Sequence, residues 1–524
     1  MRYLVFITAF FICSLASAQP NPQPSKITEK FFPDPEIEIN TPAFSKKKGF
    51  TDYDEMLVFL NALQAEFPEV VTIEFIGKSQ KGKAIPLVTL AKKEAIEKPV
   101  KVWIQGGLHG NEPGSTESTF HLMNKLLKDP AYAHLLDRLH IAIVPMANID
   151  GYEKNNRDAI NGLDLNRDQT KLNAPESVVL KKAFSDYSPE VALDLHEYNA
   201  YRKHFAQLST FGISSIYDVL FLYTGNLNVP ENLRNYIDER FVENARIELD
   251  KHHLNHNDYM STTKHEGEIQ FNKGATSPRS SATSYALTNC ISALIEVRGV
   301  HLGRTSFKRR VQSAFLVSSS FLETAYQHVD ELRAEIQKAN EAQTNSVVKS
   351  KRAVYEDSIQ VIDMDTRSEM PLQITVRDAL KSSPVIERTR ATAYLIRKEE
   401  SKLLEKLQTL GLEIHYLEKA SKLEVESYLV SEYEQAQEKF EDIRIQTVQT
   451  TISTEQIDFA EGTAVVLMNQ PKANLAIEVL EPEAINSFVA YEVLPTALNE
   501  TLPIYRYVKP DAPEHITLKQ NHHD

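Results

Sequence analysis

The first regular pattern along the chain is an amphipathic helix followed by a pair of β-type runs. Apolar residues recur at helical spacing over residues 53–67, which predicts a helix with one buried face. Residues 70–76 and 85–90 are β-rich, and the polar connection between them has glycine near both ends. Such a pattern predicts a β-hairpin.

The pattern then changes to short apolar runs that alternate with helical segments. The runs cover residues 100–105, 139–144, 191–195 and 293–297, and the helical patterns between them include 116–127 and 175–184. Continuous apolar runs of this length are typical of strands buried on both faces, and alternation with helices favours parallel pairing. The fold class predicted is therefore α/β, with a mostly parallel mixed sheet covered by helices on both faces.

A boundary is expected after a long helical pattern over residues 306–338. The polar stretch 338–352 is interpreted as a linker, and residues 353–524 as a smaller β-rich accessory domain built around one helix at 397–410. Its β-type runs cover 359–362, 393–396, 413–416, 424–430, 443–451 and 464–467. This region contains no convincing repeat and no chemical motif.

The N-terminus carries the pattern of an export signal. One positive charge precedes a short apolar run, and Ala16-Ser17-Ala18 ends it. We expect residues 1–18 to be a signal peptide, residues 19–49 an N-terminal extension, and the protein to be exported, to the periplasm or the medium. An uncleaved anchor is the alternative, but no later segment approaches the length of a membrane span, so none is expected after signal cleavage. Cys290 is then the only thiol of the mature chain, and intrachain disulfides are excluded.

The formal net charge is −14. Nucleic acids and anionic membranes bind basic surfaces, so this charge argues against both as partners. The sequence does not indicate an oligomeric state.

Candidate chemistry follows two of the predicted strands. The run 100–105 leads into a glycine-rich turn that carries His109 and Glu112, and Ser115 is expected to cap the helix after it. His196 lies at the end of the run 191–195, on the same expected rim of the sheet. Two histidines and a carboxylate with an open fourth position are typical of a catalytic zinc ion, so we expect one Zn²⁺ per chain. Asp194 or Glu197 could orient a ligand imidazole, or could be solvated.

Residues 150–168 carry a longer motif. Their sequence, DGYEKNNRDAINGLDLNRD, resembles the signature of the zinc carboxypeptidase family, and this chain is identified as an exported bacterial member. The resemblance runs from about Phe50 to Val329 and implies a catalytic domain at residues 50–337 with an eight-stranded sheet.

The resemblance also implies roles for individual residues. His109, Glu112 and His196 would hold zinc, Asn166 and Arg167 would bind the terminal carboxylate of the substrate, and Arg157 would polarise the scissile carbonyl. Glu296, in the buried run 293–297, would be the general base. Physical chemistry agrees: a planar guanidinium matches a carboxylate, and a carboxylate buried in an apolar strand is costly without a partner or a metal.

Some positions depart from the family pattern. Tyr259 and Tyr285 are both candidates for the tyrosine that closes over substrate in well-known relatives, and their spacing does not rank them. Arg279 could bind substrate or anchor a loop. The side-chain preference at the cleaved residue cannot be inferred, because residues 259–285 match the family poorly.

The function expected is hydrolysis of C-terminal peptide bonds in substrates with a free carboxylate. Three alternatives remain open: an amide deacylase of the aspartoacylase or succinylglutamate desuccinylase type, a carboxypeptidase that cleaves cell-wall peptides, and a non-catalytic binding module. The export signal favours a peptidase over the typically intracellular deacylases, and an intact Glu296 argues against a binding-only protein.

Overall fold

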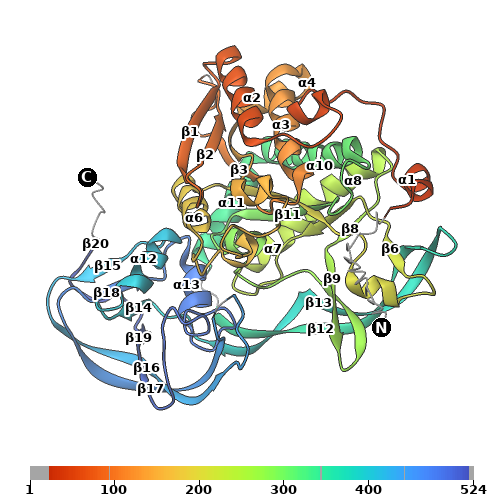
Figure 1. Cartoon of the computed structure of the whole chain (residues 1–524). Coiled ribbons are helices and arrows are strands. Elements are labelled where there is room, and N and C mark those ends of the chain that lie inside the picture. Colours follow the sequence, from red (N-terminus) through yellow and green to blue (C-terminus); the bar gives the residue numbers. More distant parts are fainter. Residues whose placement is uncertain (1–22, 94, 343–344, 442, 519–524) are drawn as a thin grey trace, which may run out of the picture.

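The computed structural model describes residues 23–93, 95–342, 345–441 and 443–518. The expected signal peptide lies outside these residues. A mixed sheet of eight strands forms the centre of the N-terminal half (Figure 1). Its strands in spatial order are β1 (Val71–Lys78), β2 (Ala84–Leu90), β4 (Leu139–Val144), β3 (Val100–Gln105), β5 (Val191–Tyr198), β11 (Ile291–Arg298), β7 (Val219–Leu222) and β8 (His256–Asp258).

Parallel pairing is confined mainly to the middle of this sheet. β4, β3, β5 and β11 are mutually parallel neighbours, whereas β1 and β2 form an antiparallel hairpin at one edge. Every residue of β5 is buried, as expected for a central strand covered on both faces. The predicted hairpin and the α/β fold class are confirmed.

Helices cover both faces of the sheet. On one face α3 (Pro113–Lys128), α8 (Glu243–Lys251) and α10 (Phe307–Gln327) pack together. On the other, Trp103 of β3 packs against Phe184 of α6 (Pro175–Tyr187), which stacks at 3.9 Å on Tyr285 of α9 (Ser281–Ala286). Further helices of this part of the chain include α1 (Ser25–Phe31), α2 (Tyr53–Glu66), α7 (Glu231–Tyr236) and α11 (Val329–Glu341).

Two helix boundaries differ from those predicted. The pattern over 306–338 is two helices, α10 and α11, because His328 between them leaves the helical region of backbone space (φ −117°, ψ 33°). α3 is capped at Glu112, three residues before the expected Ser115, with Pro113 in its first turn. Proline has the φ of a first helical residue and no N–H to lose there, so it starts the helix early.

A second sheet is dominated by a long two-stranded ribbon, β12 (Ser346–Asp363) and β13 (Ser368–Arg388). Around it lie β6 (Ile213–Ser215), β9 (Met260–His265) and β10 (Glu268–Lys273), all contributed by the first half of the chain. Figure 1 shows the ribbon passing beneath the central sheet toward the C-terminal strands. The segment expected as a linker, 338–352, is therefore mostly regular structure: α11 continues to Glu341 and β12 begins at Ser346. The domain limits themselves stay a prediction.

Residues 393–518, here called the C-terminal region, build a seven-stranded sheet. Its strands in order are β17 (Gln446–Phe459), β16 (Ser421–Gln435), β19 (Thr501–Tyr507), β14 (Ala393–Ile396), β18 (Ala464–Leu467), β15 (His415–Leu417) and β20 (Ile516–Leu518). Helices α12 (Ser401–Thr409) and α13 (Ala473–Leu480) accompany them. The β-rich character predicted for the end of the chain is confirmed. One hydrophobic core runs continuously from Met56 to Ile504, so this region packs on the first half of the chain. In the described residues no helix is long and apolar enough to span a bilayer.

Candidate active site

Three predicted ligand residues meet at the carboxyl ends of β3 and β5. His109 lies in the turn after β3, Glu112 at the start of α3, and His196 within β5. The turn is tight: Gly107 has φ of +65°, and a Cβ atom there would lie 2.6 Å from the Thr116 hydroxyl. Glycine at this position therefore lets the backbone pass close to α3 and carry His109 over the sheet edge.

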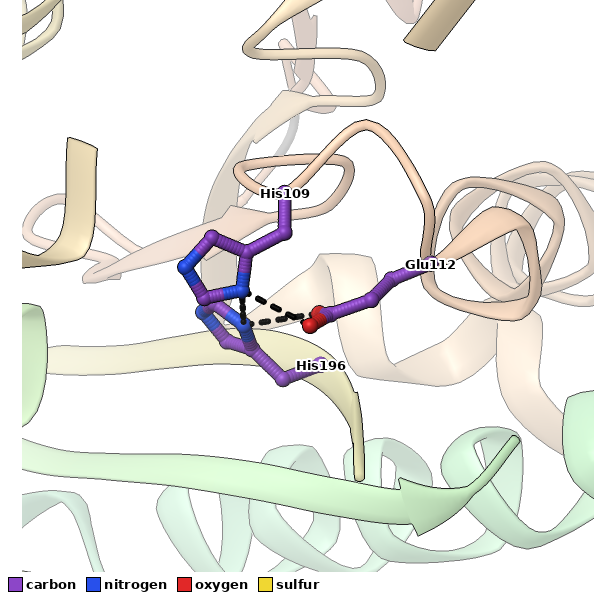
Figure 2. Close-up of side chains that lie close together, drawn as sticks. All are labelled: His109, Glu112 and His196. Atoms are coloured by element: carbon purple, nitrogen blue, oxygen red, sulfur yellow. Dashed lines mark hydrogen bonds and ion pairs between the residues drawn. The ribbon is translucent and has the colours of Figure 1, made fainter. Parts of the chain in front are cut away.

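The ligand atoms converge on one point (Figure 2). Nδ1 of His109 lies 2.7 Å from Oε1 of Glu112, and Nδ1 of His196 lies 2.9 Å from Oε2 of the same carboxylate. The two Nδ1 atoms are 3.0 Å apart, and all three side chains are buried. Two imidazole nitrogens and one carboxylate are a donor set that zinc prefers, and three protein ligands leave a position for substrate or water. The residues present fit that ion.

Each histidine is oriented through its other ring nitrogen. Nε2 of His109 lies 3.1 Å from Asp164, and Nε2 of His196 lies 2.9 Å from Asp194. A carboxylate at this place fixes the ring and raises its basicity as a ligand. Burial alone would raise the pKa of the Glu112 carboxyl, but the adjacent His109 and His196 hold it well below its usual range, so Glu112 remains an anionic ligand.

Glu197, the other orienting candidate, has a different role. Its carboxylate pairs at 2.6 Å with buried Arg310 and accepts a hydrogen bond from the Gly114 N–H. Its own N–H donates to Glu112. Of the two, Asp194 is the residue that contacts a ligand imidazole, whereas Glu197 supports Glu112 through its backbone.

Glu296 faces the same point from β11. It is directly opposite His196 in the parallel β5–β11 register, and its Oε2 is buried without a hydrogen-bond partner. Burial, together with the nearby Glu112 carboxylate, raises the pKa of the Glu296 carboxyl. A carboxylate with an unpartnered, buried oxygen beside a metal-ligand cluster is a candidate for proton transfer. Arg298, its possible ion-pair partner two residues on, instead donates to Ser214, Ser215 and Gln23.

A cavity of about 480 Å³ opens beside the cluster. The predicted site residues that line it are His109, Arg157, Asn166, Arg167, Tyr259, Arg279 and Glu296. Tyr285 does not line it: this residue is fully buried against Phe184, and its hydroxyl lies 3.4 Å from Gln105. Of the two candidate tyrosines, only Tyr259 faces the cavity.

Neighbouring residues orient the predicted substrate-binding side chains through hydrogen bonds. Arg157 donates to Asp164 through Nε and Nη2, and its Nη1 lies 3.2 Å from Nδ1 of His109. Asn166 accepts a hydrogen bond from the Ser281 N–H at 2.8 Å, which leaves its amide N–H₂ as a donor. Arg167 donates only to the Asn166 carbonyl within the described residues.

Three residues around the site were missed from the sequence. Asp164 lies within the quoted motif and contacts both His109 and Arg157. The motif therefore contains this residue, but the sequence alone did not predict its role. Arg202 and Arg352 also line the cavity. Neither belongs to a motif, and only the fold brings them there.

Comparison with known proteins gives consistent results. A model of the family described as zinc carboxypeptidase matches residues 56–325. Carboxypeptidase 2 of Trichophyton rubrum is 28% identical over 490 residues, covering 89% of this chain and 90% of that protein. Carboxypeptidase 2 of Trichophyton equinum is 28% identical over 444 residues, covering 82% and 81%. The family match ends at residue 325, whereas the alignment with the T. rubrum protein covers 89% of this chain. The similarity to that protein therefore extends into the C-terminal region.

Among solved structures, a metallo-carboxypeptidase from Burkholderia cenocepacia superposes with a TM-score of 0.41 at 19% identity. The superposition covers 53% of this chain and 70% of that chain.

Proposed function

Because this chain belongs to the zinc carboxypeptidase family and is a metallocarboxypeptidase, we propose that it removes C-terminal residues from peptides with a free carboxylate. Glu296 is the general base in this proposal. The observation that carries the proposal is the Glu296 carboxylate, which lines the cavity with its Oε2 buried and without a hydrogen-bond partner, beside the convergent His109, Glu112 and His196. One zinc ion per chain would be held by those three side chains, and it would supply Lewis-acid polarisation of the scissile carbonyl and activation of the attacking water.

Asn166 and Arg167 bind the terminal carboxylate of the substrate in this proposal. Arg167 has no carboxylate partner among the described residues, and a guanidinium can donate two parallel hydrogen bonds to a carboxylate. The Asn166 amide is oriented by its bond from Ser281. The pair therefore selects a free C-terminus and positions the last peptide bond.

Arg157 stabilises the negative charge that develops on the scissile carbonyl oxygen. Asp164 fixes its guanidinium through two bonds, which leaves Nη1 directed at the ligand cluster. A cation held in place before the reaction needs no reorganisation when charge develops. Asp164 thus orients His109 and Arg157 together.

Glu296 takes a proton from the attacking water and passes it to the leaving amine. Its raised pKa favours the first transfer, because the carboxylate is a stronger base than that of an exposed glutamate. Tyr259 lines the same cavity.

We further infer that the protein is exported. The support is the signal pattern of residues 1–18. N-terminal sequencing of protein recovered from the periplasm or medium tests this, with a mature start near Gln19 expected. An intact Met1 in cell-associated protein would contradict it.

The central test compares wild type with Glu296→Gln on one peptide in free-acid and amidated forms. Wild type is expected to bind close to one zinc per chain and to shorten only the free-acid peptide. The variant is expected to retain zinc and to lose about 100- to 10,000-fold in turnover, the usual contribution of general-base catalysis. Bound zinc with equal cleavage of the amidated peptide would contradict the role of Asn166 and Arg167. A fully active variant would exclude Glu296 as the base.

A further inference from the structure

The cavity beside Glu296 carries more positive charge than one terminal carboxylate requires. Besides Arg157, which is paired with Asp164, it is lined by Arg167, Arg202, Arg279 and Arg352. None of these four forms an ion pair with a carboxylate within the described part of the chain. Guanidinium groups at a protein surface are normally neutralised by carboxylates or solvated, and this chain has a net charge of −14. A concentration of unpaired arginines in one concave site therefore indicates an anionic ligand.

Arg279 adjoins the residues that bind the terminal carboxylate. It lies two residues before Ser281, whose N–H donates to Asn166, and its carbonyl accepts a bond from the Gln169 N–H. Its Nη1 is buried and has no hydrogen-bond partner. A buried guanidinium N–H without a partner costs free energy unless a ligand satisfies it.

The C-terminal region holds this guanidinium in position. Asn486 accepts a hydrogen bond from Nε of Arg279 at 2.9 Å, and the rings of Phe440 and Tyr491 lie 5.2 and 5.0 Å from its guanidinium carbon. All three contacts involve neutral groups, so they fix the direction of the side chain and leave its charge uncompensated.

Arg352 enters the cavity from the ribbon. The register of β12 against β13 shifts between Lys351 and Ala353, so Arg352 lies opposite a bulge whose extra residues, 379–382, belong to β13. A bulge redirects one side chain out of the strand alternation. Nη1 of Arg352 is likewise buried without a hydrogen-bond partner. Burial lowers the pKa of both Arg279 and Arg352, and the neighbouring Arg167 contributes at Arg279.

Arg202 completes the positive wall. Its guanidinium carbon lies 5.1 Å from the ring of Tyr259 and 5.8 Å from that of Tyr198. Three separate segments of the chain thus place cations in one cavity, beside Asn166 and Arg167, the residues proposed to bind the terminal carboxylate. The single α-carboxylate of a peptide can neutralise only part of this charge.

We propose that the enzyme prefers peptides ending in glutamate or aspartate, with Arg279 and Arg352 binding the side-chain carboxylate of the residue that is released. This inference rests on the proposed function and specifies its substrate class. Arg167 and Asn166 bind the α-carboxylate, and the second carboxylate lies against the adjoining arginines. The C-terminal region then contributes to specificity through Asn486, a positioning residue.

The first experiment uses wild-type, zinc-loaded protein and four peptides identical except for a terminal Glu, Gln, Leu or Lys. We expect kcat/KM for Glu to exceed that for isosteric Gln by about tenfold or more, the size of a charge-assisted hydrogen bond. A fifth peptide carries Glu at the penultimate position before Gln. Equal rates for Glu and Gln, or a gain only with the penultimate Glu, would overturn the proposal.

A binding experiment tests this inference independently of the catalytic proposal. Glu296→Gln protein, with and without zinc, is titrated calorimetrically with N-acetylglutamate and N-acetylglutamine. Tighter binding of the glutamate by about tenfold supports the acidic site even if no peptide is cleaved. Equal binding of the two compounds overturns it, whether or not peptides are cleaved.

Variants locate the preference. Arg279→Gln and Arg352→Gln are each expected to lower the Glu-to-Gln ratio of kcat/KM toward one. Arg377→Gln is the matched control, because this β13 arginine donates to Gln270 and does not line the cavity. Asn486→Asp tests the same charge without removing the arginine. It places a carboxylate where the Asn486 amide oxygen now accepts from Arg279, and so neutralises the charge of the Arg279 guanidinium. An unchanged ratio in the two arginine variants and in Asn486→Asp would overturn the assignment.

Discussion

His109 and His196 face each other through the same ring nitrogen, with their Nδ1 atoms 3.0 Å apart on either side of the Glu112 carboxylate. The opposite nitrogen of each ring is turned to an aspartate. The lone pairs of both rings are thereby directed to one position, the arrangement that a shared cation requires.

Zinc is therefore expected to stabilise the folded chain as well as to permit catalysis. At free zinc 100 times the dissociation constant, the gain in unfolding free energy is about 2.7 kcal/mol. Thermal unfolding with added zinc and with chelator measures it. The shift should disappear in His196→Ala, and a shift of equal size in that variant would indicate that zinc binds elsewhere.

Asp194→Asn is expected to weaken zinc binding by about 10- to 100-fold, because the amide no longer provides an anionic partner for Nε2 of His196. Competition with a chelator of known affinity gives the dissociation constant. Asp250→Asn is a matched control, since Asp250 also contacts a histidine, His256, at 3.0 Å, but on an exposed surface. Equal zinc affinity in both variants would contradict the orienting role of Asp194.

Arg310→Met is expected to destabilise the protein by about 3–5 kcal/mol, because it leaves the buried Glu197 carboxylate without its cation. Denaturant unfolding measures the loss, and adding Glu197→Gln to the same chain should restore part of it. The exposed pair Arg240 and Glu331, at 3.1 Å, provides the comparison. Arg240→Met should cost less than about 1 kcal/mol.

Lys181 should make stability rise with pH. Burial lowers its pKa from 10.5 to about 7 in the folded chain, so between those values the unfolded chain binds the extra proton and stability increases as pH rises. Lys181→Met is expected to remove about 1.4 kcal/mol per pH unit from this slope between pH 8 and 9. Urea unfolding at each pH measures the slope.

The neighbouring Lys182→Met serves as the control for that series. Lys182 lies on the same helix but is exposed and paired with Asp186. Its slope should match wild type. Parallel slopes in all three proteins would mean that Lys181 stays charged in the folded state between pH 8 and 9.

Much of the metal centre could be predicted, from one short motif and from the ends of buried strands. His109 and Glu112 share one turn, and the strands that carry His196 and Glu296 are continuous apolar runs whose ends lie on one sheet edge by topology. The roles assigned to Glu296, Asn166, Arg167 and Arg157 remain predictions until variants are measured.

Other features could not be predicted, for physical reasons. β12 and β13 carry charged side chains along both faces, so their sequence lacks the apolar alternation that identifies a strand. Arg352 lies at a register shift of the β12–β13 ribbon, and that shift depends on how the two strands pair rather than on the residues around Arg352 alone. The break at His328 has no glycine or proline to mark it.

The dependence of Arg279 on Asn486 has a consequence for the timing of biosynthesis. When residue 344 has been synthesised, every metal ligand and Glu296 have been made, yet Arg352, Phe440, Asn486 and Tyr491 have not. At about 5–20 residues per second, the remaining 180 residues take on the order of ten seconds or more. The residues that shape the substrate cavity are therefore among the last to be made, and because one hydrophobic core joins both halves of the chain, the catalytic centre and its complete cavity are expected to form together.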